Sequence, residues 1–149
     1  MPNEKVEIYD VKTGKTELVD KIQKTDKDWE KELGSQSFCV LRQHQTERPH
    51  TGPLNQMKEK GIYKCAACGT DLFRSNDKFD SGTGWPSFFQ PVAETNIGTR
   101  EDADHGMRRT EIHCARCGGH LGHVFEDGPE PTGMRYCINS ASLKFEKQE

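Results

Sequence analysis

The chain has 149 residues, a length that suits one domain. Hydrophobic residues make up 32% of it, against roughly 45–50% in typical globular domains, so its core needs help that a structural metal can supply. The net charge is −3 and no basic stripe is visible, which argues against nucleic-acid binding.

Residues 1–20 are polar and mixed in charge, with no apolar segment of a signal peptide, and no apolar run is long enough to span a bilayer. We therefore expect a cytoplasmic protein with no membrane partner. Six cysteines could instead form three disulfides in a secreted protein. Paired C-x-x-C spacing in a reducing compartment favours metal or redox chemistry over that alternative.

The N-terminal segment shows only weak alternation of apolar residues, at Val6, Ile8 and Val11, among many charges. We expect residues 1–24 to form a loosely ordered arm. The remainder, residues 25–149, is expected to form one domain.

Two short helices are predicted next. Thr25, with Asp28 three residues later, resembles a capping box for a helix that Gly34 ends. Ser35 could begin a second helix, and the proline-rich turn at residues 48–53 cannot continue it.

From residue 61 onward, short strands alternate with glycine-containing turns, so we predict a mainly antiparallel β domain behind the helices. The predicted strands are Ile62–Lys64, Asp71–Arg74, Thr95–Arg100, Met107–Cys114, Leu121–Phe125 and Arg135–Phe145.

Four cysteines form two C-x-x-C-G units, Cys65/Cys68 and Cys114/Cys117. Each unit can aim two thiolates at one point, and four thiolates suit a tetrahedral Zn²⁺ ion. Four cysteines leave no open coordination position, so the zinc is expected to be structural and to join two distant turns. An iron site is chemically allowed, whereas two thioredoxin-type redox pairs would need a βαβ pattern that is missing.

The other two cysteines, Cys39 and Cys137, are not needed for the metal and suggest redox chemistry. If residues 135–145 form one strand, Arg135, Cys137 and Asn139 share a face. A cation two residues from a thiol is expected to lower its pKa. The alternative is a small buried cysteine beside a surface arginine.

Two histidines, His120 and His123, lie in a glycine-rich approach to a predicted strand. Histidine moves protons near neutral pH. On a regular strand the two rings would face opposite sides, but a bulge at Gly122 could turn both into one pocket. Two structural histidines are the alternative.

The segment over residues 82–89 fixes Trp85 between a glycine and a proline. Such a rigid aromatic wall suits an apolar or sulfur-containing substrate. A core loop with no binding role has the same composition.

Together, the motifs G-W-P-S-F, H-G-M-x-R-T-E, G-H-L-G-H-V-F-x-D-G-P-x-P-T-G and R-Y-C-I-N-S-A-S-L resemble the B-type methionine-R-sulfoxide reductases. The resemblance runs in order from Trp29 to Phe145 and includes the four zinc cysteines. It implies two antiparallel sheets with short N-terminal helices, and a thiol reductase acting on methionine-R-sulfoxide in proteins. Separately, we expect a monomer.

The resemblance also assigns roles to residues. Cys137 becomes the nucleophile, Trp85 holds the S-methyl group, and His123 protonates the sulfoxide oxygen. The positions expected to assist catalysis are His120, Asn139 and Arg135, and those expected to line the substrate pocket are His105 and Phe125.

Reduction by a thiol leaves a sulfenic acid, which a second thiol converts into a disulfide that an external dithiol opens. Many family members carry that second thiol where this chain has Thr83. We therefore expect Cys39 to resolve the Cys137 sulfenic acid, with thioredoxin as the family's reductant. An inert Cys39, with direct regeneration of Cys137, is the alternative.

Two other classes of function compete. A zinc-stapled protein-binding module explains the four metal cysteines but leaves Cys137, Trp85 and the histidines without a role. A cysteine hydrolase using Cys137 and His123 needs an oxyanion hole that the sequence does not reveal.

Overall fold

The computed structural model describes residues 4–22, 24–43, 45–48, 52, 54, 57–103 and 108–147. The helices among them are α1 (Asp26–Leu33) and α2 (Ser35–Gln43). The strands are β1 (Lys5–Asp10), β2 (Lys15–Asp20), β3 (Gly61–Cys65), β4 (Asp71–Arg74), β5 (Lys78–Phe79), β6 (Ser87–Phe88), β7 (Ile97–Asp102), β8 (Arg109–Cys114), β9 (His120–Phe125), β10 (Arg135–Ile138) and β11 (Leu143–Lys147). Short 3₁₀ turns occupy Ser75–Asp77, Glu94–Asn96 and Ser140–Ser142.

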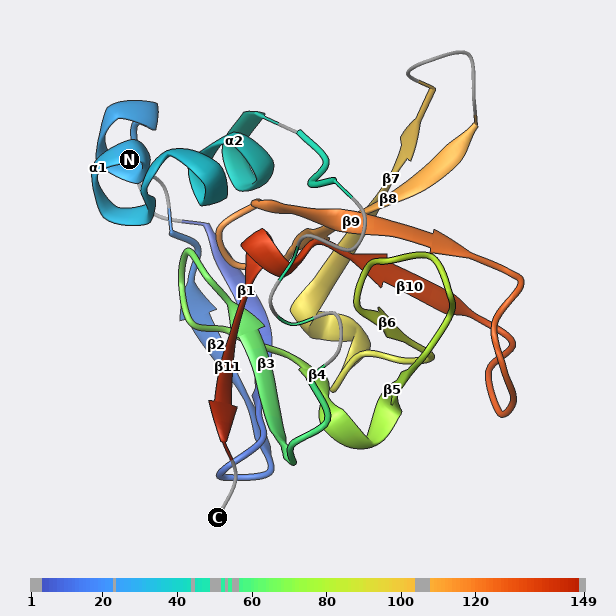
Figure 1. The fold of residues 1–149 in the computed structure, drawn as a ribbon. Coiled ribbons are helices and arrows are strands. Elements are labelled where there is room, and N and C mark those ends of the chain that lie inside the picture. Colours follow the sequence, from blue (N-terminus) through green and yellow to red (C-terminus); the bar gives the residue numbers. More distant parts are fainter. Residues whose placement is uncertain are drawn as a thin grey trace.

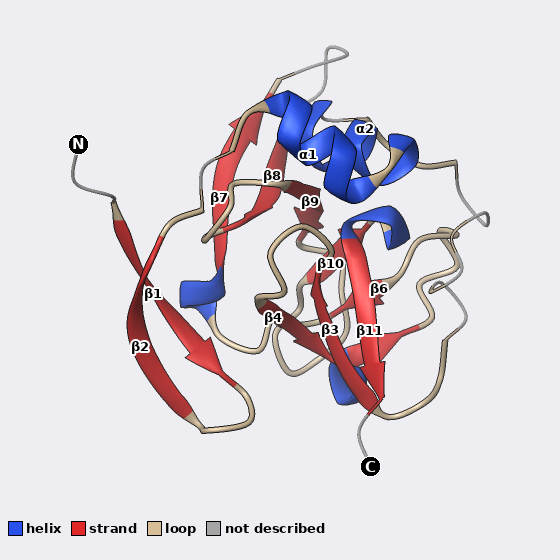
Figure 2. Ribbon diagram, turned by 90° about the vertical axis from the view of Figure 1, so that its left-hand side faces the viewer, coloured by secondary structure: helices blue, strands red, loops and turns tan. Residues whose placement is uncertain are grey.

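All strand pairs are antiparallel. A six-stranded sheet has the order β5-β6-β10-β9-β8-β7, a three-stranded sheet has the order β11-β3-β4, and β1 and β2 form a separate hairpin. The two helices lie together at one end of the molecule, and the β1–β2 hairpin runs along one side (Figures 1 and 2). The predicted mainly β fold with two antiparallel sheets and short N-terminal helices is confirmed.

The predicted helix signals act as expected. Asp28 donates its backbone N–H to the Thr25 hydroxyl at 3.2 Å, which caps α1. Gly34 ends the helix with a φ of 78°, a conformation that favours glycine. Trp29 of α1 is completely buried, so this short polar helix is fixed by one large apolar side chain.

Aromatic residues join the two main sheets. Phe73 of β4 stacks on Phe88 of β6 with ring centroids 4.4 Å apart, and Tyr63 of β3 meets Phe88 edge-on at 5.0 Å. All three rings are completely buried. Such pairs stabilise a core beyond the area they bury, which suits a chain with few hydrophobic residues.

The prediction of one strand over residues 135–145 is wrong. The turn at Ser140–Ser142 divides it into β10, in the six-stranded sheet, and β11, in the three-stranded sheet. Ser142 donates its backbone N–H to the Asn139 carbonyl and its hydroxyl to the His120 carbonyl. Serine and asparagine side chains that bond to the backbone favour turns over strands, so the face shared with Cys137 ends at Asn139.

The N-terminal hairpin is attached through Asn96, which is completely buried. The Asn96 amide accepts a bond from the Tyr9 N–H at 2.8 Å and donates to the carbonyls of Tyr9 and Asp71. Residues 1–24, where we expected a loosely ordered arm, contain this hairpin. The division of the chain at residue 25 stays a prediction.

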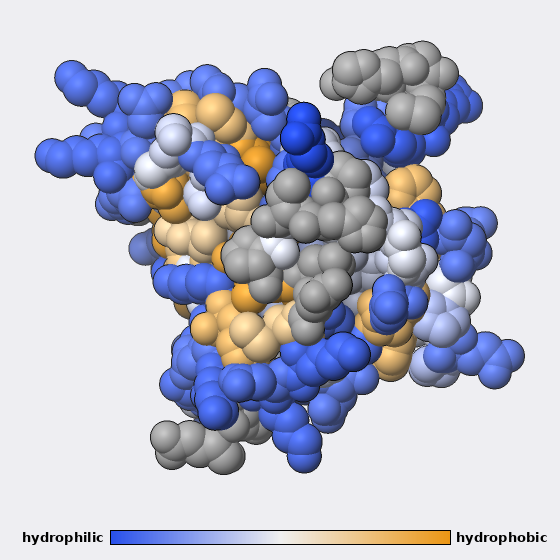
Figure 3. Space-filling model, viewed as in Figure 1, coloured by the Kyte–Doolittle hydropathy of each residue, from blue (hydrophilic) through white to orange (hydrophobic). Residues whose placement is uncertain are grey.

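The surface is mainly hydrophilic in the view of Figure 3, with apolar residues in small separate patches. Among the described residues, no helix is both long enough and apolar enough to cross a membrane.

Candidate active site

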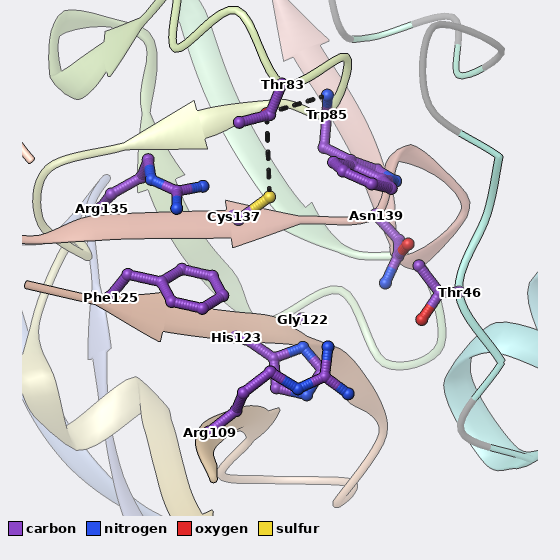
Figure 4. Close-up of a pocket in the computed structure, with 10 residues that line it drawn as sticks. All are labelled: Thr46, Thr83, Trp85, Arg109, Gly122, His123, Phe125, Arg135, Cys137 and Asn139. Carbon is purple, nitrogen blue, oxygen red and sulfur yellow. Dashed lines mark hydrogen bonds between the residues drawn. The ribbon is translucent and has the colours of Figure 1, made fainter. Parts of the chain in front are cut away.

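A cavity of about 240 Å³ opens above β9 and β10. Cys137 lies near its middle, with Trp85 and Asn139 toward one end and Arg135 and Phe125 toward the other (Figure 4). The cavity is lined by Thr46, Thr83, Trp85, Arg109, Gly122, His123, Phe125, Arg135, Cys137 and Asn139. Six of the positions predicted for the site therefore line one cavity.

Cys137 is half-buried in β10, with its sulfur 4.0 Å from the Thr83 hydroxyl oxygen. Burial raises the pKa of the Cys137 thiol above its ordinary value. Thr83, which can donate to the thiolate form, and the nearby Arg135 lower this pKa, but burial outweighs them. The predicted lowering of the pKa is therefore wrong for the protein without substrate.

A chain of hydroxyl groups leads away from the Cys137 sulfur. Ser81 is 2.7 Å from both Thr83 and Ser87, and the Ser87 hydroxyl donates to the Trp85 carbonyl. Because each hydroxyl has one proton, Ser87 must accept from Ser81, Ser81 from Thr83, and Thr83 from the thiol. This direction favours the protonated thiol, and the chain must reverse to stabilise a thiolate.

The predicted bulge in the histidine strand exists. Along the β8–β9 pair, Ile112 lies opposite Gly122 whereas His113 lies opposite His120, so β9 contains one extra residue. The His120 and His123 rings consequently approach edge to face, with centroids 5.5 Å apart. Only His123 lines the cavity, because the buried His120 is directed to Glu111, with its Nδ1 2.8 Å from a carboxylate oxygen.

His123 is held by an acidic residue that the sequence interpretation missed. Its Nε2 lies 2.8 Å from the Asp102 carboxylate, and Arg109 lies 3.4 Å from the same oxygen. Burial lowers the pKa of His123, with smaller lowering from Arg109 and His120, and Asp102 opposes these effects. Asp102 and Arg109 are cross-strand partners at the ends of β7 and β8. A correct prediction of which residues pair across this hairpin would therefore have placed these two side chains together.

Arg135 lies beside the cysteine and also binds an acidic partner. Its guanidinium makes two hydrogen bonds to Asp127, at 2.8 and 3.2 Å, and lies 4.4 Å from the Phe125 ring centroid. These contacts fix the cation and the aromatic ring together at one wall of the cavity.

Trp85 forms another wall, and its position is fixed by hydrogen bonds. Its indole N–H donates to the Glu47 carbonyl at 2.9 Å. Glu47 in turn donates its backbone N–H to the Asn139 side chain, whose amide nitrogen donates to the Leu121 carbonyl. Asn139 therefore lines the cavity and also holds its walls together.

Two predicted site residues lie elsewhere. Cys39 is half-buried in α2 and does not line the cavity. His105 lies outside the described residues. The roles predicted for these two residues, and for the residues that line the cavity, so far rest on the sequence alone.

The two C-x-x-C units meet in space. The sulfur atoms of Cys65, Cys68, Cys114 and Cys117 all lie within 4.8 Å of one another. The closest contacts cross between units, with 3.6 Å from Cys65 to Cys117 and 3.5 Å from Cys68 to Cys114. Tetrahedral bonds of ~2.3 Å separate sulfur atoms by about 3.8 Å, so the four thiols fit one metal ion.

The four clustered cysteines come from both main sheets. Cys65 ends β3 and Cys114 ends β8, and each is followed by a turn that brings back the second thiol of its unit. Gly69 and Gly118 follow these turns with φ angles of 78° and 76°, as expected for tight knuckles. A metal bound here ties the three-stranded sheet to the six-stranded sheet.

Comparison with known proteins gives a consistent result. A family model described as the SelR domain matches residues 33–147. The chain is 58% identical over 127 residues to a peptide methionine sulfoxide reductase MsrB of Leptospira interrogans, which covers 85% of the chain and 97% of the relative. An MsrB of Methanosarcina mazei is 57% identical over 87% of the chain and 92% of its own length, and one of Agrobacterium fabrum is 56% identical over 85% and 93%. The resemblance indicated by the sequence motifs is confirmed.

Proposed function

Because the chain belongs to the SelR-domain family of MsrB peptide methionine sulfoxide reductases, enzymes that act on methionine-R-sulfoxide, we propose that Cys137 carries out this reduction in proteins. One observation carries the proposal. Cys137 and His123 are cross-strand partners on neighbouring strands and face one cavity with aromatic walls. A nucleophile and a proton donor thus lie next to each other in the cavity that a sulfoxide would enter.

The substrate side chain enters the cavity with its S-methyl group against Trp85. Phe125 supplies a second aromatic surface, and sulfur–aromatic contact favours a methionine-like side chain. The indole is tethered to Glu47, so the methyl group meets a wall of fixed position. This fixed wall supports discrimination between the two sulfoxide epimers.

The reaction transfers one oxygen atom. The Cys137 sulfur attacks the sulfoxide while a proton reaches the sulfoxide oxygen, which makes the substrate sulfur electrophilic. The sulfoxide sulfur gains two electrons and becomes a thioether, and the cysteine sulfur loses two and becomes a sulfenic acid. The sulfenic acid carries one proton, the same number as the thiol it replaces, so the net reaction moves only the oxygen atom.

Cys39 then completes the cycle. Its thiol attacks the sulfenic acid, which releases water and forms a Cys39–Cys137 disulfide. Cys39 does not line the cavity, and the disulfide requires its Cα atom and that of Cys137 to lie within about 7 Å of each other. Thioredoxin, a dithiol, opens the disulfide by exchange and is oxidised in turn.

The tetrad binds Zn²⁺ as a structural ion. Its four thiolates would fill a tetrahedral shell and leave no position for substrate. The ion's role is to hold the two sheets together, and the chemistry takes place at Cys137. Since one chain supplies every proposed group, a monomer is expected to be active.

The proposal is tested with a peptide that contains both methionine sulfoxide epimers and with dithiothreitol as reductant. The wild-type protein should consume only the R epimer, and Cys137→Ser should abolish turnover while folding and metal content stay normal. The matched control, Cys39→Ser, should turn over with dithiothreitol but fail with thioredoxin. A wild-type protein that consumes neither epimer would favour a zinc-stapled binding module.

The proposed disulfide has its own readout. After one turnover without reductant, mass spectrometry of wild-type protein should show a Cys39–Cys137 link and the loss of two hydrogens. A stable sulfenic acid on Cys137 in the same experiment would mean that Cys39 is not the resolving residue.

A further inference from the structure

The contact between His123 and Asp102 joins two strands that are not neighbours. Asp102 is the last residue of β7, at the edge of the six-stranded sheet, and His123 lies on β9, with β8 between them. The carboxylate nevertheless lies 2.8 Å from His123 Nε2. The end of an edge strand therefore holds the proposed proton donor.

This contact determines which ring nitrogen carries a proton. An ionised carboxylate only accepts hydrogen bonds, so Nε2 of His123 must be the protonated nitrogen of the neutral ring. Nδ1 is then the nitrogen available to a ligand in the cavity. The two nitrogens of this ring are therefore not interchangeable, because Asp102 decides between them.

We propose that Asp102 is a positioning residue for His123, which keeps the proton on Nε2 and leaves Nδ1 to deliver the proton that the sulfoxide oxygen receives. This inference rests on the proposed function. In the step, the imidazolium gives its Nδ1 proton to the oxygen as Cys137 attacks. The Cys137 thiol proton returns to Nδ1, so the ring ends as it began.

Several charged or titratable groups face His123 from the surrounding strands. They are Asp102 on β7, Arg109 and Glu111 on β8, His120 on β9 and Cys137 on β10. Burial, Arg109 and His120 lower the pKa of His123, and Asp102 is the group that opposes them. Without this carboxylate, the imidazolium would form only at lower pH.

The first test compares Asp102→Asn with the neighbouring control Glu101→Gln, whose carboxylate contacts the exposed Arg108. Asp102→Asn should shift the alkaline limb of the kcat profile to lower pH and reduce kcat at pH 7 by roughly tenfold or more, with little change in KM. Glu101→Gln should match the wild type. A folded Asp102→Asn variant with the wild-type pH profile would overturn the inference.

The second test reads the wild-type protein and needs no turnover, and a variant serves only to assign the signal. Nitrogen chemical shifts of His123 in the wild-type protein report its tautomer, with the signal assigned by its loss in His123→Gln. The neutral ring should carry its proton on Nε2, whereas a proton on Nδ1 would overturn the inference. Because this readout does not depend on sulfoxide turnover, failure of the proposed function and failure of this inference are distinguishable.

Discussion

Cys137 is protonated in the free protein, although the proposed reaction needs a nucleophilic sulfur. Burial raises its pKa, and the hydroxyl chain through Thr83 and Ser81 is oriented to accept the thiol proton. Burial also lowers the pKa of His123. Both groups are therefore neutral near pH 7. A bound sulfoxide, whose oxygen accepts a proton from the His123 imidazolium, favours transfer of the thiol proton to His123 and hence the thiolate–imidazolium pair. This arrangement protects the thiol from oxidants when no substrate is bound.

Thr83 and Ser81 should affect the thiol in opposite directions. Thr83→Val removes the group that donates to the thiolate, so alkylation of Cys137 by iodoacetamide at pH 8 should slow by about threefold, since a bond at this long distance is weaker than the ~1.5–3 kcal/mol of a typical charge-assisted one. Ser81→Ala frees the Thr83 hydroxyl to donate, so alkylation should speed up. Slower alkylation in both variants would contradict the assigned direction of the chain.

At the scale of elements, buried asparagines link segments that are far apart in the sequence. Asn139 joins the segment after α2 to β9, and Asn96 joins the N-terminal hairpin to β4. Both are buried, so each amide replaces hydrogen bonds that the backbone would otherwise make to water. Strand pairing alone fixes neither connection.

Asn96→Ala should release the hairpin without unfolding the rest. The variant leaves the Tyr9 N–H and the Asp71 carbonyl without their partner, which should lower the free energy of unfolding by about 2–4 kcal/mol. Hydrogen exchange should accelerate at β1 and β2 and stay slow at β9 and β10. Unchanged exchange at Lys5–Asp20 would show that other contacts hold the hairpin.

At the scale of the whole molecule, two connections hold the main sheets together. One is the aromatic stack of Tyr63, Phe73 and Phe88, and the other is the cysteine tetrad at the ends of β3 and β8. The tetrad lies in the turns after β3 and β8, whereas the cavity around Cys137 lies over β9 and β10. The metal should therefore affect activity through stability alone.

Loss of one metal ligand should destabilise the whole fold. Cys114→Ser should lower Tm by roughly 10 °C or more, given about 2–4 °C per kcal/mol for a chain of this size. Cys39→Ser, which removes a thiol outside the tetrad, should leave Tm within ~2 °C of the wild type. Calorimetry with metal analysis checks both values, and a Cys114→Ser variant with unchanged Tm would contradict a structural role for the site.

Local signals in the sequence predicted the local structure well. The Thr25 cap, the Gly34 helix end and the glycine after each C-x-x-C unit all act as expected, because each depends on a few adjacent residues. The bulge beside Gly122 was also predicted. Asp102 was missed because its role depends on a contact across two strands, which local patterns do not encode.

The error at residues 135–145 has a similar cause. An alternating pattern continues through Leu143 and Phe145, and only the hydrogen bonds of Ser142 show that the chain turns. The raised pKa of Cys137 was missed because sequence spacing shows a neighbouring cation but not the depth of burial. The sequence predicts the order of the elements along the chain, but it does not predict the distances between them in space.

The turn at Ser140–Ser142 begins three residues after Cys137 and carries the chain from one sheet to the other. The position of Cys137 therefore depends on both sheets, and a mutation deep in either one can displace it. Grafting β9 and β10 onto another scaffold would not transfer the activity, because the position of the sulfur depends on how the two layers are stacked. Directed evolution of this protein should consequently find activity-altering substitutions in β3 and β11, far from any group that touches substrate.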